Sequence, residues 1–321
     1  MSGERELLQR LIEGPVSGDA LARDAGLTRA AVWKRIEALR EGGVRIDAQP
    51  GRGYALAEAM ELLDVDAIRA QLAPTPHGQL AALEVAWSLD STNSELLRRP
   101  APQSGTAVLL AEQQTGGRGR RGRYWASPIA SNLYLSLSRQ FSGGLARLGG
   151  LSLVVGIAVA EALRQAGYPQ VALKWPNDLV AQGRKLGGVL VEGGGEHGGP
   201  VRAVIGIGVN VRMPMDVAAH IDQPWIDLAT LGAPPSRNAL AARLVSALLA
   251  ALDAFDQEGL PPFLPRYAAL DALAGREVVL HAADGDAHGV ADGIGEDGAL
   301  RVRIGHEVRH VHAGEVSVRM Q

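Results

Sequence analysis

The run at residues 116–125 carries the densest set of chemically active side chains in the sequence. It reads Gly-Gly-Arg-Gly-Arg-Arg-Gly-Arg-Tyr-Trp, so four arginines alternate with glycines and end on an aromatic pair. Guanidinium groups bind anions, and glycine lets the backbone approach a ligand closely. Because a glycine-rich segment is costly to order, we expect this one to stay mobile until an anionic ligand binds it. The pattern predicts a flexible cationic lid.

The same run formally matches the dinucleotide-binding fingerprint, with glycines at positions 117, 119 and 122. That fingerprint requires a helix directly after the loop and an acidic residue about 20 positions later to bind the ribose. Here the strand-like residues 132–135 follow instead, and the acidic residue is missing. Residues 183–185 also lack the glycine spacing and the hydroxyl of a P-loop. Neither of these phosphate-binding loops is predicted.

A second group of chemically active side chains lies between residues 174 and 192. It reads Lys-Trp-Pro-Asn-Asp at 174–178 and Arg-Lys-Leu-Gly-Gly at 184–188. The chain has three lysines, Lys34, Lys174 and Lys185, and two of them fall in this stretch. A Trp-Pro-Asn-Asp turn can point an amide and a carboxylate at a ligand, and a glycine-rich strand admits that ligand. A structural turn beside a solvated lysine is the alternative interpretation.

Two further segments could line a polar binding site. Residues 90–95 read Asp-Ser-Thr-Asn-Ser-Glu, which predicts a helix start with Thr92 and Glu95 as a capping box. Side chains and amides at such a helix start can also bind a polar ligand. Residues 205–210 read Ile-Gly-Ile-Gly-Val-Asn, which predicts a strand whose glycines allow a ligand to approach.

The elements around these motifs begin with a small helical module over residues 1–60. Ser17 and Thr28 are placed to cap two helices separated by Gly26, and residues 44–46 and 54–56 flank a Gly-Arg-Gly turn. This arrangement, with a basic second helix, is typical of a winged helix-turn-helix. Nine basic and nine acidic residues balance over residues 1–60, with basic ones concentrated on the second helix and the wing. We expect DNA binding; a purely structural three-helix module is the alternative.

The remainder of the chain predicts alternating strands and helices, followed by a β-rich tail. Helices are expected from Asp64, over residues 145–165, and from Ser236 to about residue 258. Strands are expected at residues 106–111, 132–138, 171–173, 187–191 and 201–211. Beyond residue 276, short β segments separated by turns at 284–285 and 297–298 predict a small β-barrel.

Composition favours a soluble globular protein. The chain is 46% hydrophobic and 21% charged with a net charge of −3, which disfavours a generally basic protein that coats nucleic acid. The lack of cysteine excludes disulfides, thiolate metal sites and cysteine nucleophiles. The first residues lack a signal-peptide pattern, and the apolar run at 148–163 is too short to span a membrane. We expect a cytoplasmic protein without membrane contact.

Together these segments resemble the bifunctional biotin–protein ligases, the BirA-type biotin operon repressors. The resemblance depends on residues 90–93, Gln114 with the Arg/Gly run, residues 174–178 and 184–188, and the wing turn at 50–54, in this order. It implies an α+β multidomain fold. A winged helix-turn-helix DNA-binding domain would span residues 1–63, a class II synthetase-like mixed-sheet catalytic domain 64–272, and an SH3-like β-barrel 273–321.

The resemblance also implies a two-step reaction that uses biotin, ATP and Mg²⁺. The biotin carboxylate would attack the α-phosphate of ATP to give biotinyl-5'-AMP and pyrophosphate. A lysine of the biotin carboxyl carrier protein, a subunit of acetyl-CoA carboxylase, would then displace AMP. With the adenylate as corepressor, a homodimer would bind the operator DNA of biotin genes. A lipoate–protein ligase and a non-catalytic biotin-sensing repressor are the alternatives.

By the same resemblance, each expected site can be assigned to positions of this sequence. Catalysis is expected of Lys185, Arg118 and Arg120. The biotin site would comprise Ser91, Thr92, Asn93, Gln114, Arg118, Gly119, Arg120, Trp125, Lys185, Gly206 and Gly208. The adenylate site would comprise Arg120, Arg121, Asn177, Lys185, Asn210 and Trp225, with Asp178 as a Mg²⁺ ligand. DNA would be contacted by Thr28, Arg29, Lys34, Arg35 and Arg52.

Overall fold

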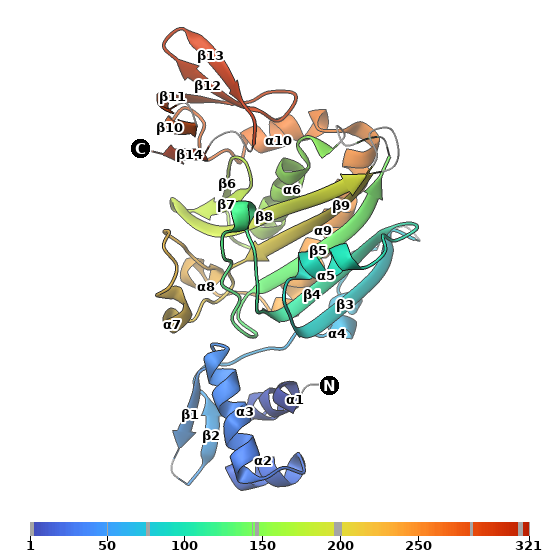
Figure 1. Cartoon of the computed structure of the whole chain (residues 1–321), viewed down its shortest axis with the longest axis vertical. Coiled ribbons are helices and arrows are strands. Elements are labelled where there is room, and N and C mark those ends of the chain that lie inside the picture. The colour runs from blue at the N-terminus through green and yellow to red at the C-terminus, as the bar shows by residue number, and fades with distance from the viewer. Residues whose placement is uncertain are drawn as a thin grey trace.

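The computed structural model describes residues 3–49, 51–74, 78–142, 144, 148–195, 201–282, 285–313 and 317–320. The expected features at Pro50, residues 145–147 and Asp284 lie outside the described residues. An N-terminal module, a large central domain and a β-rich C-terminal domain follow one another along the longest axis of the molecule (Figure 1).

The N-terminal module has the predicted helix-turn-helix and wing. Its helices are α1 (Gly3–Ile12), α2 (Gly18–Asp24) and α3 (Arg29–Glu41), and its antiparallel strands are β1 (Ile46–Gln49) and β2 (Gly53–Leu56). The hydroxyl of Ser17 accepts a hydrogen bond from the Ala20 amide, and that of Thr28 accepts one from the Ala31 amide. Both predicted helix caps are therefore confirmed, since each hydroxyl satisfies an amide at the start of its helix.

The central domain is built on a seven-stranded mixed sheet with the order β3-β4-β5-β9-β8-β7-β6. Only the β3–β4 pair is parallel among the described strands. Strands β3 and β7 were not expected from the sequence, because their residues alternate poorly between apolar and polar types. The strands are β3 (Leu80–Leu89), β4 (Thr106–Gln114), β5 (Leu133–Phe141), β6 (Ala172–Lys174), β7 (Asp178–Ala181), β8 (Arg184–Gly195) and β9 (Val201–Val209).

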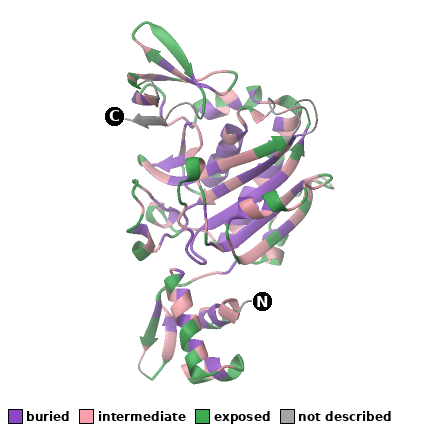
Figure 2. Ribbon diagram, viewed as in Figure 1, coloured by how far each residue is buried: buried purple, intermediate pink, exposed green. Residues whose placement is uncertain are grey.

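Helices cover the two faces of this sheet unequally. The long helices α6 (Leu151–Gln165) and α9 (Arg237–Glu258) pack on each other and on one face, whereas α5 (Thr92–Arg98) contacts β4, β5 and β9. The central strands β4, β5 and β9 and the helix α6 are mainly buried (Figure 2). Of the helix predicted over residues 145–165, the described part α6 starts at Leu151 and not at residue 148, because Gly150 takes a left-handed conformation with φ of 80°.

Helix α9 is apolar and long enough to cross a membrane by composition alone. Among the described residues it is the single helix of this kind, and 61% of its most apolar stretch of 18 residues is buried inside the molecule. Ser236 caps this helix through the Ala239 amide, as predicted. The burial against α6 identifies α9 as a core helix. Shorter helices complete the domain: α4 (Val65–Ala70), η1 (Arg120–Gly122), α7 (Met215–Ala218), α8 (Leu228–Leu231), η3 (Pro261–Phe263) and α10 (Leu264–Ala268).

The C-terminal domain is a five-stranded antiparallel sheet with the order β13-β12-β11-β10-β14. Its apolar residues, including Leu280, Leu300 and Val302, belong to the same buried cluster as the central domain. The indole of Trp175 donates a hydrogen bond to the Gly298 carbonyl, at 3.1 Å. Its strands are β10 (Glu277–Ala282), β11 (Gly285–Ile294), β12 (Leu300–Ile304), β13 (Glu307–Val311) and β14 (Ser317–Met320).

A buried polar network fixes the segment between the N-terminal module and the central domain. Glu112 on β4 accepts a hydrogen bond from the Leu63 amide and pairs with Arg237 at 2.8 Å, and both charged side chains are almost completely buried. Glu61 accepts hydrogen bonds from Ser236 and Asn238. Burial alone would raise the pKa of Glu61, but these hydrogen bonds outweigh it and lower the pKa. The segment is therefore attached to the start of α9.

The module also contacts the central domain directly, at the end of α3. The Ile129 amide donates a hydrogen bond to the Gly42 carbonyl at 2.8 Å. Ile129 and Ala130 belong to the hydrophobic cluster of the module. Since residues 128–130 follow the Arg/Gly run, that run and α3 are joined through a few packed residues.

Candidate active site

The floor of the candidate site is formed by the start of α5 and by neighbouring strands. Ser91, and not Thr92, is the N-cap of α5, because its hydroxyl accepts the hydrogen bond from the Ser94 amide. The Thr92 side chain instead lies in the buried interior, where its hydroxyl is 3.1 Å from Oε1 of Gln114. The predicted capping box of Thr92 and Glu95 was therefore wrong, since a tertiary contact decides which hydroxyl caps the helix.

Asn93 continues this floor toward β8. Its Nδ2 donates to a carboxylate oxygen of Glu192 at 2.8 Å, and its Oδ1 lies 2.6 Å from the Ser136 hydroxyl. Ser136 also contacts the Thr92 hydroxyl at 2.6 Å. Ser136 and Glu192 were not among the site residues expected from the sequence. Ser136 could have been found as a serine inside an apolar strand, and Glu192 as the acid that ends the predicted strand at 187–191.

The Arg/Gly run (residues 116–125) is attached to this floor at both of its ends. Nη2 of Arg118 donates to Ser94 at 2.9 Å and lies 3.3 Å from Glu192. At the other end, Nε2 of Gln114 donates to the Ser127 hydroxyl at 3.2 Å. Within the run, the Gly119 amide donates to the Arg123 carbonyl at 2.7 Å. The structure therefore brings the run and the floor together in one hydrogen-bonded network, whereas the mobility of the run stays a prediction.

Lys185 and Asp178 form an ion pair beside this network. The two residues lie on the adjacent strands β8 and β7, and Nζ of Lys185 is 2.8 Å from a carboxylate oxygen of Asp178. The Lys185 side chain is only 20% exposed, and its ammonium lies 5.6 Å from the centre of the Trp125 ring. The backbone of Lys185 pairs with Trp225, which brings the second aromatic residue next to the ammonium-bearing strand.

Arg120 and Asn177 extend the cationic side of the site. Nη1 of Arg120 donates to Oδ1 of Asn177 at 3.2 Å, and Nδ2 of Asn177 donates to the Val189 carbonyl at 2.7 Å. Burial, followed by the charge of Arg121, lowers the pKa of the Arg120 guanidinium. A half-buried cation next to a second arginine is a favourable place for a phosphate, because an anion would relieve the repulsion between them.

Gly206 and Gly208 were expected to give a ligand access to β9. In this structure the space above them is filled by the protein itself. A Cβ atom at Gly206 would collide with the Asn93 amide, and one at Gly208 would lie 2.5 Å from Cε2 of Trp125. The indole nitrogen of Trp125 is buried and, among the described residues, has no hydrogen-bond partner. The two glycines thus admit side chains of the site.

Asn210 and Asp178 complete the predicted adenylate and metal residues. Asn210 is buried and donates to the Ile226 carbonyl at 3.1 Å, which positions the segment that contains Trp225. Asp178 is the partner of Lys185. Within the part of the chain that the structure describes, no group of three or more His, Asp or Glu side chains is arranged to bind a metal ion.

The predicted DNA-contacting residues are distributed over the N-terminal module. Lys34 on α3 and Arg52 at the tip of the wing are exposed. Arg29 is exposed but pairs with Asp19 of α2. Arg35 lies against α1 and donates to the Gly3 carbonyl at 3.3 Å, which differs from its expected position on the DNA face. Thr28 caps α3.

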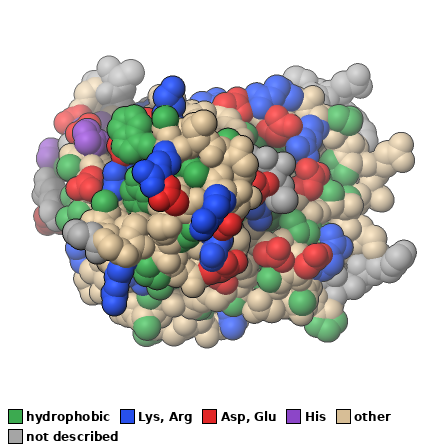
Figure 3. Space-filling model, turned by 90° about the horizontal axis from the view of Figure 1, so that it is seen from below, with side chains coloured by type: hydrophobic (Ala, Val, Ile, Leu, Met, Phe, Trp, Pro, Cys, Tyr) green, Lys and Arg blue, Asp and Glu red, His purple; other side chains and the backbone are tan. Residues whose placement is uncertain are grey.

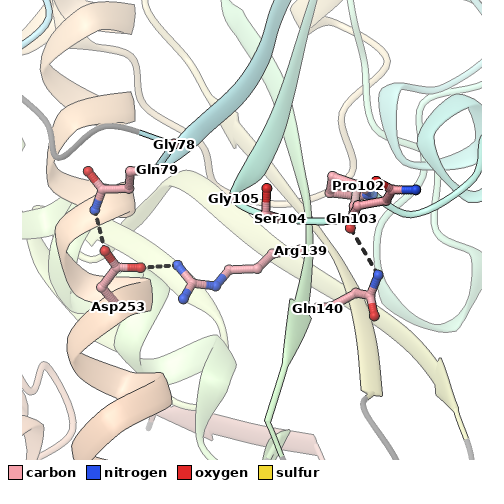
Figure 4. A pocket seen from close by; sticks show the side chains of 9 residues that line it. All are labelled: Gly78, Gln79, Pro102, Gln103, Ser104, Gly105, Arg139, Gln140 and Asp253. Atoms are coloured by element: carbon pink, nitrogen blue, oxygen red, sulfur yellow. Dashed lines mark hydrogen bonds and ion pairs between the residues drawn. The ribbon is translucent and has the colours of Figure 1, made fainter.

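A cavity of about 290 Å³ lies at the start of β4, at the other end of this strand from Gln114. Its arginine, Arg139, is engaged by Asp253, which also accepts from Gln79 (Figure 4). Asp256 contacts the same guanidinium. Since two carboxylates already surround this cation, the cavity is a poor anion site.

Comparison with known proteins is consistent across the whole chain. Three family models match: the HTH domain at residues 4–55, the Biotin/lipoate A/B protein ligase family at residues 85–210, and the Biotin protein ligase C terminal domain at residues 274–319. The bifunctional ligase/repressor BirA of Salmonella typhimurium is 43% identical over 98% of this chain and 96% of its own.

Two further comparisons concern ligases. The biotin–[acetyl-CoA-carboxylase] ligase of Mycobacterium tuberculosis is 34% identical over 79% of this chain and 95% of its own. The solved structure of the biotin protein ligase from Aquifex aeolicus in complex with biotin and ATP is 26% identical, with a TM-score of 0.63, over 75% of this chain and 99% of that chain.

Proposed function

Because the chain belongs to the family of BirA-type bifunctional ligase/repressors, we propose that its candidate site activates biotin with ATP as biotinyl-5'-AMP and then transfers the biotinyl group to a carrier-protein lysine. Its enzymatic activity is that of a biotin–[acetyl-CoA-carboxylase] ligase, and its helix-turn-helix module makes it a repressor as well. The observation that supports this site most strongly is the single polar network that joins the Arg/Gly run to the start of α5, with Lys185 and Arg120 beside it.

In the proposed first step, a carboxylate oxygen of biotin forms a bond to the α-phosphorus of ATP. The bond from that phosphorus to the bridging oxygen breaks, and pyrophosphate leaves. Two anionic groups repel each other unless fixed cations spread their charge, which is the role proposed for Lys185, Arg118 and Arg120. Asp178 orients the Lys185 ammonium through their 2.8 Å ion pair.

In the proposed second step, the amine of a carrier lysine forms a bond to the biotinyl acyl carbon, and AMP leaves as the amine loses a proton. The mixed anhydride between the steps reacts with water and with stray amines, so it needs cover. The Arg/Gly run with Trp125 is proposed to provide that cover. We propose that it becomes ordered when biotin and the adenylate bind.

The polar network suits the ureido ring of biotin, which has two N–H donors and one carbonyl acceptor. In the proposed complex, Oε1 of Gln114 and the hydroxyls of Ser91 and Thr92 would accept from the ring and the Asn93 amide would donate to it, in exchange for the internal hydrogen bonds that they make in this structure. We propose that biotin displaces the Trp125 indole from the space above Gly208, while Gly119 and Gly206 admit the ring.

The adenylate is proposed to lie beyond Lys185, against Asn177, Asn210, Trp225 and the arginines of the run. Mg²⁺ would be bound mainly by the triphosphate, with Asp178 as a protein ligand, and would neutralise part of its charge. One carboxylate next to a phosphate site is enough for this mode of binding, because Mg²⁺ keeps several waters.

The finer architecture and the partners are also proposals. We propose domain boundaries between residues 63 and 64 and between residues 272 and 273. We also propose that the central sheet is class II synthetase-like and that the C-terminal domain is an SH3-like barrel. The carrier is proposed to be the biotin carboxyl carrier subunit of acetyl-CoA carboxylase. The adenylate-bound protein is proposed to bind operator DNA as a homodimer in the cytoplasm.

Incubation of the protein with biotin, MgATP and a carrier domain tests the function. We expect a mass increase of one biotinyl group on the carrier and none when ATP is omitted. Lipoate is the comparison substrate, because the matching family model covers ligases for both acids. Transfer of lipoate in preference to biotin would contradict the proposal, as would ligand binding without any transfer.

A further inference from the structure

Trp33 is a large aromatic side chain on the outward face of α3. It is 54% exposed, whereas the inward-facing Val32, Ile36 and Leu39 are buried in the core of the module. With 3.6 residues per turn, Ala30 and Lys34 share the outward face with Trp33. Figure 3 views this end of the molecule and shows hydrophobic side chains at the surface beside Lys and Arg side chains. The module is thus folded without using the indole as a core residue.

The groups around Trp33 leave little scope for reading guanine on this face. Arg29, one turn before Trp33, has its guanidinium engaged by Asp19. Lys34 is exposed but carries a flexible point charge, which suits a phosphate better than a pair of base atoms. Glu37, one turn after Trp33, pairs with Arg40 at 2.7 Å. The exposed centre of the face therefore consists of an indole and the methyl group of Ala30.

In a helix-turn-helix, residues near the start of the second helix contact base edges in the major groove. Trp33 is the fifth residue of α3, within this region. The thymine methyl is the apolar group that base pairs present in that groove, and apolar side chains recognise it by contact. We propose that Trp33 packs on thymine methyl groups in the operator half-site and so specifies T·A pairs. This inference depends on the repressor function proposed above.

The expected contribution of each contact is modest and measurable. Burying one methyl group between indole and helix changes the free energy of binding by about 0.8 kcal/mol, which corresponds to about a fourfold change in affinity. Contacts with two thymines, one in each half-site of an operator bound by a dimer, would change the affinity about 16-fold by the same reasoning.

The test begins with the full chain in the presence of biotin and MgATP. Binding sites are selected from a random double-stranded DNA pool, and each thymine of the selected half-site is then replaced singly by deoxyuridine, which lacks the methyl group but pairs identically. For the wild type, we expect affinity to fall about fourfold at one or two thymines and to stay unchanged at the others.

Three variants complete the test. Trp33→Ala is expected to bind the thymine and deoxyuridine sites equally and to relax selection at those positions, whereas Trp33→Phe retains part of the discrimination. Lys34→Gln is the matched control, with weaker binding to all sequences, a salt slope reduced by about one and unchanged discrimination. Circular dichroism of each variant checks that the module is folded.

The outcomes separate this inference from the repressor function. If the wild type selects a defined site that is insensitive to deoxyuridine at every thymine, the inference is overturned and the repressor function stands. The same holds if Trp33→Ala selects the same sequence as the wild type. If the wild type selects no sequence at all, the repressor function fails, and the inference fails with it.

Discussion

Replacing Lys185 by methionine removes the ammonium but keeps an unbranched apolar side chain against Trp125. In the structure Nζ of Lys185 lies 2.8 Å from Asp178, and the side chain is 20% exposed. The site is thus partly desolvated and already contains one balancing carboxylate. We expect Lys185→Met to leave the fold intact and to stop adenylate formation selectively.

The size of the effect follows from the burial of this ammonium. At an effective dielectric constant of about 20, two unit charges about 4 Å apart interact by roughly 4 kcal/mol. Part of this interaction exists before the reaction, because the biotin carboxylate and the triphosphate are already charged, and Asp178 offsets another part. About 3 kcal/mol of transition-state stabilisation remains, within the range for loss of one oxyanion-stabilising group, which corresponds to a loss of roughly 10²-fold in rate.

Biotin-dependent exchange of labelled pyrophosphate into ATP measures this step without the carrier protein. Lys34→Met is the matched control, because it removes a lysine from the N-terminal module, and we expect its exchange rate to equal that of the wild type. A double variant, Lys185→Met with Asp178→Asn, separates two causes. Because Asp178 is also the proposed Mg²⁺ ligand, the single variant Asp178→Asn is measured beside it, and recovery of exchange in the double variant is the decisive result.

Two results would refute this reasoning. A loss of less than tenfold in Lys185→Met would show that the ammonium does not stabilise the transition state. Recovery of exchange in the double variant would show that the defect came from an unpaired Asp178 carboxylate, so that Lys185 would be a structural partner and not a catalytic residue.

Three further changes test other parts of the structure. Arg120→Gly removes a cation that contacts Asn177, so we expect premature release of the adenylate; mass spectrometry should find biotin on bystander proteins, and unlabelled bystanders would contradict the lid. Glu192→Gln removes the negative charge to which Asn93 donates, a charge-assisted hydrogen bond of about 1.5 to 3 kcal/mol, so the KM for biotin should rise at least tenfold with kcat changed less; an equal fall of kcat with KM unchanged would refute this positioning role. The hydrogen bonds that lower the pKa of Glu61 stabilise the inter-domain segment while this carboxylate is ionised. The stabilisation is fully present above the ordinary glutamate pKa of 4.5 and is lost as the pH falls through the lower pKa of the folded state. Hydrogen exchange at residues 61–64 should therefore accelerate below that range in the wild type and be fast already at pH 7 in Glu61→Gln, and identical pH profiles would rule this out.

Much of the local structure could be predicted because it depends on neighbouring residues. Ser17, Thr28 and Ser236 cap their helices through amides three residues away, so their role can be recognised from the sequence. The apolar spacing of α9 likewise predicts its length within a residue or two. Each motif that carries the chemistry, such as the Arg/Gly run or the motif that contains Lys185, is a continuous stretch of sequence and can be recognised as one.

Contacts between residues far apart in the chain were decided by the tertiary structure alone. Asn93 and Glu192 are 99 positions apart, and no local pattern marks them as partners. The same long-range packing turns Thr92 into the interior and makes Ser91 the cap. It also places Trp125 above Gly208.

The division between the two has one physical reason. Caps, turns and amphipathic spacing result from forces within about one helical turn, which the sequence records directly. The site depends on which strands become neighbours, and that depends on burial of the whole core, with Lys185 and Asp178 brought together by the pairing of β8 with β7. The sequence by itself therefore determined which chemical groups this protein has, and the tertiary structure decided which of them touch.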